Sequence, residues 1–500
     1  MKRTLLTLAA ALLPVVAYAA SPNLAPVKKW TYNHASTGVT GQTSEIVAFD
    51  SKTNTIWAAG VQGVDVLNAH TGTLLQHIDT SGFGFINSVA IHNGLAAFAI
   101  ESKVDRTLPG TVKFYDTTTR ALASGTNSVT VGSLPDMLTF TPNGSRLLVA
   151  NEATPTTYGG VDPKGSVSII DMSTRSLITS AGFDLVPTSG SNIRSPGMNY
   201  EPEFIAINAA GTKAFVSLQE HNAMGVLNLA TNAFEKIIGL GAKDFNDPAN
   251  KIDPRDNASV AFINPNTVSG LASVKVKGLY QPDGMATFEA ASKTYIVMAN
   301  EGDFREDDAD RSAASGFGVA GTSILGRLRV SNTDSTSGDL YAAGGRSFSI
   351  RDEDGNLVFD SGGQLDFEAN LRGIYDDGRS RDKGVEPEGV ELMTIGGRVL
   401  AFIGLERTTK GAVAIYDVTD PAHASFVDML VTNGDLAPEG MKGFVMDGQY
   451  MLAIGNETSA TTTLYSLAPV PEPETYAMLL AGLGLLGFVA RRRKQSAATV

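Results

Sequence analysis

The chain has 500 residues, of which 43% are hydrophobic and 18% are charged, and it contains no cysteine. This composition excludes a mostly disordered chain, and the absence of cysteine excludes disulfides, thiolate catalysis, zinc–thiolate sites and iron–sulfur clusters. Because the formal net charge is -13, the folded body should repel nucleic acid, and we expect no nucleic-acid partner.

The first 19 residues have the pattern of a secretory signal peptide. Lys2 and Arg3 give a basic start, an apolar run follows from Leu5 to Val16, and residues 17–19 (Ala-Tyr-Ala) form a small-x-small cleavage site. We therefore expect residues 1–19 to be removed on export. A short buried N-terminal helix is the alternative interpretation.

Residues 20–468 contain a hairpin pattern that recurs seven times. Each copy has an alternating strand, a turn, a nearly continuous apolar strand, and a third strand that glycine opens and Asp or Asn closes, as in Gly411 to Asp417. Such repeats, stretched by insertions, predict an all-β fold of four-stranded antiparallel blades, a β-propeller. Leu24 to Tyr32 is expected to add a strand to the final blade and close the ring.

Five copies of the hairpin carry a carboxylate at both ends, whereas the first copy keeps only Glu45 and the second only Glu101. An antiparallel hairpin returns to its starting point, so the two acids of each copy should be neighbours. First strands of propeller blades line the central channel, and we expect the acids to gather at one mouth of it. The predicted metal-binding residues are Asp136, Glu152, Glu203, Glu220, Asp283, Glu301, Asp303, Glu388, Glu406, Glu439 and Glu457.

So many carboxylates in one place require either protonation or a bound cation. Oxygen ligands without cysteine favour calcium over zinc or copper, so calcium is the expected cofactor. The alternative is that these residues are turn formers and solvated charges. A separate acidic run, Asp352 to Asn356, begins like an EF-hand loop but lacks the closing Glu, and a hairpin turn is the preferred interpretation.

Three polar insertions are expected on the same rim as the acids, where long loops commonly carry function: 238–273, 302–346 and 362–385. Arginines adjoin these rim segments and could hold a phosphate, although salt bridges with the acids are the preferred interpretation: Arg194, Arg305 and Arg407. No Ser-His-Asp arrangement or Gly-x-Ser-x-Gly elbow is present in the sequence, so no catalytic residue is assigned.

The C-terminal residues 469–494 have the pattern of a second targeting signal, which is followed by a tail of residues 495–500. Pro-Glu-Pro at 471–473 precedes an apolar helix at 476–490 and a basic cluster at 491–494. The apolar run is shorter than the roughly 20 residues of a full transmembrane helix. This segment resembles the PEP-CTERM sorting signal. The resemblance implies an exosortase partner, an inner-membrane-anchored precursor, and delivery to the cell surface or extracellular matrix. A plain C-terminal membrane anchor is the alternative.

Four sets of residues in the repeats carry a family likeness: Pro135-Asp136 with Ala150 to Glu152, Gln281 to Gly284 with Asn300 to Asp303, Arg346 to Phe348 with Asp354 to Leu357, and Glu386 to Gly389. On these residues the repeats resemble the choice-of-anchor I family, which is related to mesenchyme-specific cell surface glycoproteins. The resemblance implies a seven-bladed propeller at the cell surface and settles no activity. More distantly, the paired acids resemble those of calcium-dependent propeller phosphatases and phytases.

Three hypotheses for the function remain open at this stage. The first is a surface-anchored, calcium-binding propeller that acts as a binding or matrix protein on exopolysaccharide or the cell envelope. The second is a metal-dependent phosphoesterase, similar to alkaline phosphatases or phytases, with a phosphorylated ligand. The third is a purely structural scaffold in the exopolysaccharide layer.

Overall fold

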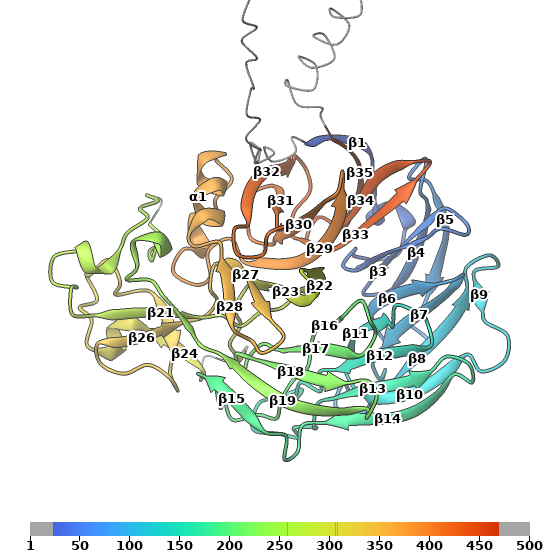
Figure 1. The fold of residues 1–500 in the computed structure, drawn as a ribbon, viewed down its shortest axis with the longest axis horizontal. Helices are drawn as coiled ribbons and strands as arrows, with labels where there is room; N and C mark the ends of the chain where they lie inside the picture. The colour runs from blue at the N-terminus through green and yellow to red at the C-terminus, as the bar shows by residue number, and fades with distance from the viewer. Residues whose placement is uncertain (1–23, 258, 306, 308, 470–500) are drawn as a thin grey trace, which may run out of the picture. The chain divides into compact units, whose positions relative to one another are not determined.

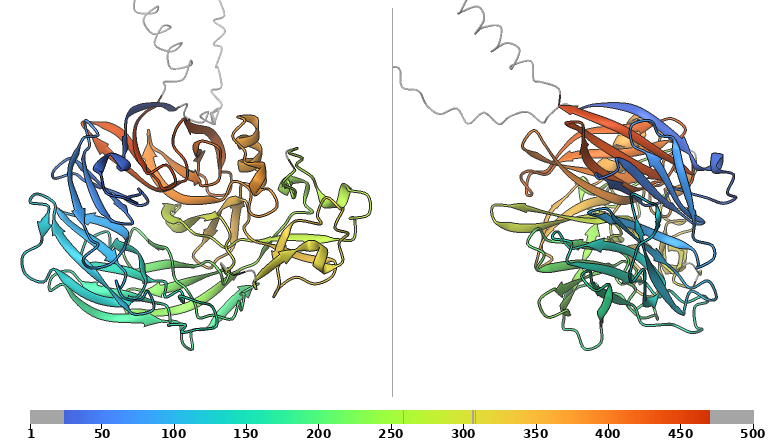
Figure 2. Two further views of the ribbon diagram at one scale, coloured as in Figure 1. Left: turned by 180° about the vertical axis from the view of Figure 1, so that it is seen from behind. Right: turned by 90° about the vertical axis from the view of Figure 1, so that its right-hand side faces the viewer.

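The computed structural model describes residues 24–257, 259–305, 307 and 309–469. In this part of the chain the elements are strands, apart from one α-helix and five short 3-10 helices, so the all-β prediction is confirmed. Figures 1 and 2 show the sheets following one another in chain order, from blue through green to red. The predicted signal peptide (1–19), the hydrophobic helix (476–490) and the tail (495–500) lie outside the described residues. Within the described ranges, no helix is long and apolar enough to cross a membrane.

Seven of the sheets among the described residues share a core of four antiparallel strands. The first sheet contains β2 (Val47–Asp50), β3 (Thr55–Gly60), β4 (Gly63–Asn68) and β5 (Leu74–Asp79), and the second contains β6 (Ile86–His92), β7 (Leu95–Ile100), β8 (Pro109–Asp116) and β10 (Ser128–Ser133), with β9 (Ala121–Leu122) on β8. The third sheet contains β11 (Pro135–Phe140), β12 (Arg146–Asn151), β13 (Ser166–Asp171) and β14 (Ser176–Gly182). The fourth contains β16 (Ile205–Ile207), β17 (Lys213–Leu218), β18 (Ala223–Asn228) and β19 (Ala233–Leu240), with β15 (Thr188–Ser191) parallel to β19. The other three contain β22 (Met285–Ala290), β23 (Lys293–Asn300), β27 (Ser347–Asp352) and β28 (Leu357–Asp360); β29 (Pro387–Ile395), β30 (Arg398–Leu405), β31 (Gly411–Asp417) and β32 (Ser425–Thr432); and β33 (Pro438–Met446), β34 (Gln449–Asn456), β35 (Thr461–Pro469) and β1 (Leu24–Asn33).

The first strands of these sheets contact one another in chain order, from β2 through β6, β11, β16, β22 and β29 to β33, and β33 contacts β2 again. The second strands are buried on both faces, as their continuous apolar runs predict. In β12, Leu147 and Val149 pack with the sheet of β7, whereas Leu148 and Ala150 pack with the sheet of β17. Alternate side chains of one strand therefore join two neighbouring sheets.

The N-terminal strand completes the last sheet. β1 pairs antiparallel with β35, from Leu24 opposite Pro469 to Asn33 opposite Thr461, so the predicted addition of a strand to the last sheet is confirmed. Figure 1 shows β1 and β35 side by side although they lie at opposite ends of the chain. Pairing with β1 covers the edge that β35 would otherwise expose.

A buried histidine fastens this closing sheet to the sheet of β4. His34 opens the 3-10 helix η1 (His34–Thr37) directly after β1, and its side chain is fully buried. Its Nδ1 lies 2.6 Å from Asp65 Oδ2, and its Nε2 lies 2.8 Å from Thr462 Oγ1. Burial and two histidine contacts act in opposite directions on Asp65, and the net effect is a lowered pKa.

The insertions contain structure that the sequence did not predict. β20 (Ala242–Asp244), β21 (Lys275–Leu279) and β26 (Asp339–Ala342) form a sheet, and β24 (Arg311–Ala313) pairs with β25 (Arg329–Ser331). An apolar cluster that includes Phe245, Leu325 and Leu328 supports them. The short helices here are η2 (Pro248–Asn250), η3 (Pro265–Thr267) and η4 (Ala314–Phe317), and the third insertion holds α1 (Gln364–Leu371) and η5 (Asp377–Arg379).

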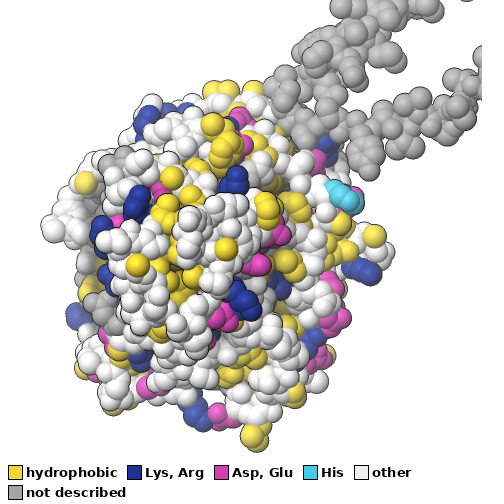
Figure 3. Space-filling view, turned by 90° about the vertical axis from the view of Figure 1, so that its left-hand side faces the viewer, with side chains coloured by type: hydrophobic (Ala, Val, Ile, Leu, Met, Phe, Trp, Pro, Cys, Tyr) yellow, Lys and Arg dark blue, Asp and Glu magenta, His cyan; other side chains and the backbone are white. Residues whose placement is uncertain are grey.

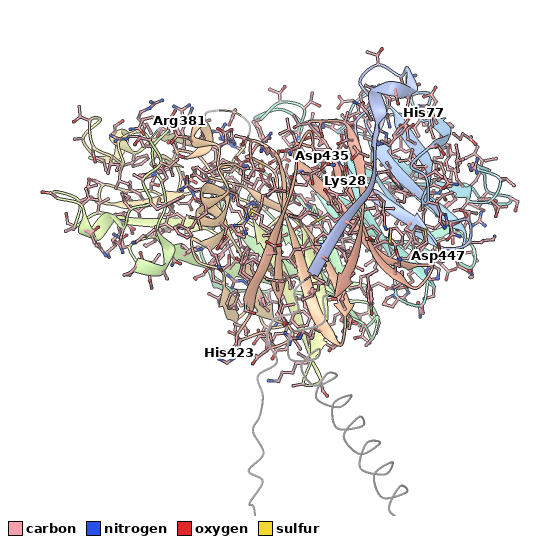
Figure 4. The ribbon with its side chains drawn as sticks, turned by 90° about the horizontal axis from the view of Figure 1, so that it is seen from above. Lys28, His77, Arg381, His423, Asp435 and Asp447 are labelled. Atoms are coloured by element: carbon pink, nitrogen blue, oxygen red, sulfur yellow. The ribbon has the colours of Figure 1, made fainter. Side chains whose placement is uncertain are left out.

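Replacing His34 by alanine should destabilise the ring closure. Because Asp65 would keep only one histidine partner in a buried position, we expect the free energy of unfolding to fall by about 2–4 kcal/mol. Chemical denaturation of the mature protein measures this change. His423→Ala is the control, since His423 is 78% exposed and lies at the periphery in Figure 4. Equal stability of the two variants would contradict the role of His34.

Candidate functional site

A cavity of about 890 Å³ lies between the seven first strands. Residues of β2, β6, β11, β16, β22, β29 and β33 line it, together with acidic side chains from the starts of these strands and the ends of the second strands. Nearly all the predicted metal-binding residues line this cavity, and only Glu220 and Glu457 do not. Those that line it are Asp136, Glu152, Glu203, Asp283, Glu301, Asp303, Glu388, Glu406 and Glu439.

The hairpin backbone holds the two acids of a copy together. In three copies the backbone N–H of the second acid donates to the carbonyl of the residue two positions before the first acid: Glu152 to Leu134 at 2.9 Å, Glu406 to Glu386 at 2.9 Å and Glu457 to Ala437 at 2.8 Å. The side chains of each pair interact electrostatically, as the antiparallel geometry predicts. The pairs are Asp136 with Glu152, Glu203 with Glu220, Asp283 with Glu301, Glu388 with Glu406, and Glu439 with Glu457.

Three of the first acids lie in a β-bulge. The register between the first and second strands shifts just after the prolines that precede Asp136, Glu388 and Glu439. A bulge bends its strand and changes the direction of the side chain that it contains. The residue before each proline has a left-handed backbone, with φ of 42° at Leu134, 51° at Glu386 and 56° at Ala437. The same local distortion therefore presents each carboxylate to the cavity.

Glycine after the acid allows neighbouring strands to approach each other at this end. A Cβ on Gly389 would lie 1.8 Å from the Glu439 carbonyl oxygen, and one on Gly440 would lie 2.4 Å from the Glu45 carbonyl oxygen. Gly284 has the same relation to Glu388, at 2.3 Å. No side chain fits in these contacts, so the starts of successive strands meet and their carboxylates crowd together.

Burial and mutual repulsion raise the pKa of these carboxyls. Burial is the larger cause in each case, and neighbouring carboxylates add to it. Glu406 reaches a pKa of about 8, Glu45 of about 7 and Asp303 of about 6. The first acids of the complete copies have pKa values well above the usual range: Asp136, Glu203, Asp283, Glu388 and Glu439.

The interactions also extend beyond single pairs. Asp283 and Glu439 each repel Asp136, and Glu203 repels both Asp136 and Asp283. The acids therefore form one cluster, which we call the acid ring: the predicted residues together with Glu45.

On the face that carries β21 and β26, Figure 3 shows acidic and basic side chains interspersed with hydrophobic ones.

Two sets of three carboxylates lie close enough to share an ion. Asp283, Glu301 and Glu388 offer oxygens within 4.8 Å of one another, and so do Glu301, Glu386 and Glu406. Calcium–oxygen distances are about 2.4 Å, so two ligand oxygens of one ion are at most about 4.8 Å apart. We call these the first and the second carboxylate group. Glu301 belongs to both.

Glu386, Lys383 and Arg379 were not predicted from the sequence, whereas Arg407 was expected to pair with the acids. Lys383 Nζ lies 2.6 Å from Glu301 Oε1 and 3.0 Å from Glu386 Oε2. Arg379 Nε lies 2.5 Å from Glu386 Oε1, and Arg407 Nη2 lies 2.5 Å from Glu406 Oε1. The acidic residue on both sides of Pro387 was the available signal for Glu386, whereas Lys383 lies in an insertion without a repeat pattern.

The first acids lack such partners. In the ranges that the structure describes, no Lys, Arg or His side chain lies within 4.0 Å of the carboxylates of these acids. Glu203 and Glu388 each have a buried Oε2 without a hydrogen-bond partner. The acids in question are Asp136, Glu203, Asp283, Glu388 and Glu439.

A second missed acid lies beside the ring. Glu201 precedes Pro202, is 1% exposed, and has no hydrogen-bond partner for either carboxylate oxygen. Burial, followed by repulsion from Glu220 and Glu152, raises its pKa to about 11. The residue therefore favours the protonated form in the folded chain.

The structure also tests the predictions for the EF-hand-like run and for the three arginines. Asp352 ends β27 and Leu357 begins β28, so the EF-hand-like run is the predicted hairpin turn. All three arginines form salt bridges, but only Arg407 pairs with a predicted acid, Glu406. Arg194 pairs with Asp310 and Asp334, and Arg305 pairs with Asp307, which are acids of the second insertion.

Comparisons relate this chain to known proteins. The model of the choice-of-anchor I domain matches residues 45–421, and that of the PEP-CTERM protein-sorting motif matches residues 469–494. A chain of Kuenenia stuttgartiensis hydrazine synthase is 11% identical with a TM-score of 0.50, covering 86% of this chain and 97% of that chain. A chain of the mitotic checkpoint complex is 10% identical with a TM-score of 0.48, covering 93% of this chain and 98% of that chain. The first likeness shows the fold alone. A comparison with curated proteins gives no match.

Replacing Gly389 by alanine should disrupt the acid ring. The new Cβ would overlap the Glu439 carbonyl oxygen, so the starts of β29 and β33 would separate and the protein should lose stability. Thermal melting of the mature protein checks this. Gly182→Ala is the matched control, because nothing lies within 4 Å of a Cβ there. Equal melting temperatures would show that the close contact is dispensable.

The stability of the protein should fall with rising pH when divalent cations are chelated. Glu45 and Glu406 have pKa values of about 7 and about 8 in the folded chain, against a usual 4.5. The folded state then binds more protons than the unfolded state, so the melting temperature should fall between about pH 5 and about pH 8. Calcium should remove most of this slope. A melting temperature that rises with pH in chelator would contradict the assigned shifts.

Proposed function

The chain belongs to the choice-of-anchor I domain family, and on this premise we propose that it is a cell-surface protein that binds calcium at its acid ring. Its PEP-CTERM motif is a sorting signal recognised by exosortase, so the chain is exported, anchored at a membrane and then displayed at the cell surface. The proposed role there is that of a binding or matrix protein, with exopolysaccharide or another envelope component as its partner.

The proposed scaffold is a seven-bladed β-propeller. Seven sheets with four-stranded cores and the cyclic contacts of their first strands, within the described residues, support this count. The pairing of β1 with β35 closes the last sheet, as expected of a ring assembled from both ends of a chain. Such a ring brings one carboxylate from each complete copy to the same cavity.

One observation carries the proposed ion binding. Five half-buried carboxylates surround a single cavity, and no cationic side chain in the described residues lies within 4.0 Å of them. A cluster of this kind is stable only if protons or a cation reduce its charge. At the near-neutral pH of most surroundings, a divalent cation competes with the protons and permits all the ligands to ionise.

The ligand chemistry selects calcium. The donors are carboxylate oxygens, and the chain has no cysteine. Among the described residues, His92 of β6 is the only histidine that lines the cavity, and none lines its acidic end. Hard oxygen ligands in a flexible arrangement suit calcium better than zinc or copper. Asp283, Glu301 and Glu388 would hold the ion, and it would neutralise the surrounding carboxylates.

A metal-dependent phosphoesterase is the second candidate, because Lys383 and Arg407 line the same cavity as the acids. A metal ion polarises a phosphoryl group, and a guanidinium binds its oxygens. Both cations are already paired with carboxylates, which favours ion binding over phosphate binding. Incubation of the mature protein with a phosphomonoester and calcium should release no phosphate. Calcium-dependent release that Glu388→Gln abolishes would establish the phosphoesterase instead.

Calcium should raise the melting temperature of the mature protein, and Glu388→Gln should remove most of this increase. A ligand that binds only the folded state stabilises it by about 2.7 kcal/mol at a hundredfold excess over its dissociation constant. Melting curves in chelator and in millimolar calcium measure the effect. Asp420→Asn, at an exposed acid, should leave the calcium response intact. No response of the unmodified protein to calcium would overturn the proposed function.

A further inference from the structure

The second carboxylate group already contains a positive charge supplied by the chain itself. The Lys383 ammonium is 2.6 Å from Glu301, 3.0 Å from Glu386 and 3.9 Å from Asp303. Its side chain is only 10% exposed. Since the oxygens of this group lie within 4.8 Å of one another, they offer the spacing that an ion requires, and the ammonium contacts two of the three residues.

The backbone holds Lys383 at this place. The next residue, Gly384, has a φ of +70°, and its N–H donates to the Arg379 carbonyl at 3.2 Å. The N–H of Val385 donates to Asp366 Oδ1 of α1 at 3.1 Å. A Cβ on Gly384 would lie 2.7 Å from the same Asp366 oxygen. The lysine therefore arises from a rigid turn that fits only with glycine after it.

The two groups differ in how their charge is balanced. In the second group, Glu386 contacts Arg379 as well as Lys383, and Glu406 contacts Arg407. In the first group, Asp283 and Glu388 have no cationic side chain within 4.0 Å among the described residues, and Glu388 Oε2 is buried without a hydrogen-bond partner. Glu301 joins the groups, with Lys383 on Oε1 and Gln219 Nε2 at 2.9 Å from Oε2.

We propose that the Lys383 ammonium is a built-in cation that fills the second carboxylate group and limits the acid ring to a divalent ion at the first. The inference rests on the proposed function, because it assigns the ion to one of two groups within the same ring. In this arrangement Lys383 determines which of the two carboxylate groups can bind a divalent ion. A monovalent charge tethered to the chain excludes a second divalent ion from a site with the correct ligand spacing.

The test is the number of calcium ions that the mature protein binds when Lys383 is replaced. Lys383→Met keeps an unbranched side chain and removes the ammonium with its charge, so the second group should gain one calcium ion. Equilibrium dialysis with calcium counts the bound ions. Lys442→Met is the matched control, because Lys442 lines the same cavity but pairs with Glu391 at 3.1 Å, and its count should equal that of the unmodified protein.

A double variant locates the additional ion. Lys383→Met with Glu386→Gln removes a ligand of the second group, so its calcium count should return to that of the unmodified protein. An additional ion that persists in the double variant would lie elsewhere and would overturn the inference. So would an unchanged count in Lys383→Met while the unmodified protein binds calcium.

Failure of this inference is distinct from failure of the proposed function. If neither the unmodified protein nor Lys383→Met binds calcium, both are wrong. If only Lys383→Met binds it, the proposed function fails while the role of Lys383 stands. Should Lys383→Met unfold in chelator, calcium is expected to restore its folding, and circular dichroism measures this restoration. No recovery with calcium, while Lys383→Arg remains folded, would refute the inference.

Discussion

Repulsion between carboxylates buried around one cavity is the constraint on which the site depends. Each charge would be tolerable alone at a solvated turn, but the sheets bring the acids together where water screens them poorly. Burial raises the pKa values of the first acids, and neighbouring carboxylates raise them further. The fold therefore requires positive charge at this place, whether from protons, from side chains or from a metal ion.

The chain meets this requirement differently in different parts of the acid ring. On the side of β23 and β30, Lys383, Arg379 and Arg407 contact the carboxylates directly. Around the first acids, the described residues provide no cation within 4.0 Å, and a bound ion is the proposed replacement. A tethered ammonium is permanent, whereas a metal ion depends on its concentration outside the cell. In the proposed arrangement, part of the acid ring is neutralised by the chain itself and part of it by calcium.

Backbone features make this arrangement possible. Left-handed residues before proline, bulges at the acids and glycines after them recur in several copies, and each is costly outside this context. The glycine contacts show why these features occur together. A Cβ at Gly389 has no room beside Glu439, so the same contact that brings the strands close also crowds their acids. Strain in the hairpins is thus linked to the position of the carboxylates.

Much of the fold followed from local patterns. The alternating and continuous apolar runs predicted strands because burial on one or both faces leaves that pattern in a strand, and the boundaries of β4 and β31 agree with it. The insertions did not follow, because the sheet of β20, β21 and β26 joins segments that are distant in sequence and have no repeat pattern. Lys383 was missed for the same reason, whereas Glu386 lies within a repeat beside Pro387 and could have been assigned.

The sequence by itself determined the all-β class, the hairpins, the acid at each end of them and the sorting motif, because each depends on residues close together in the chain. Only the tertiary structure decided which acids lie within 4.8 Å of one another and which have a cationic side chain beside them. Lys383 and Glu301 are 82 residues apart, and their contact depends on how an insertion folds back over the ring. Electrostatic interactions depend on the distance between side chains in the folded protein, and the separation of two residues along the chain does not give that distance.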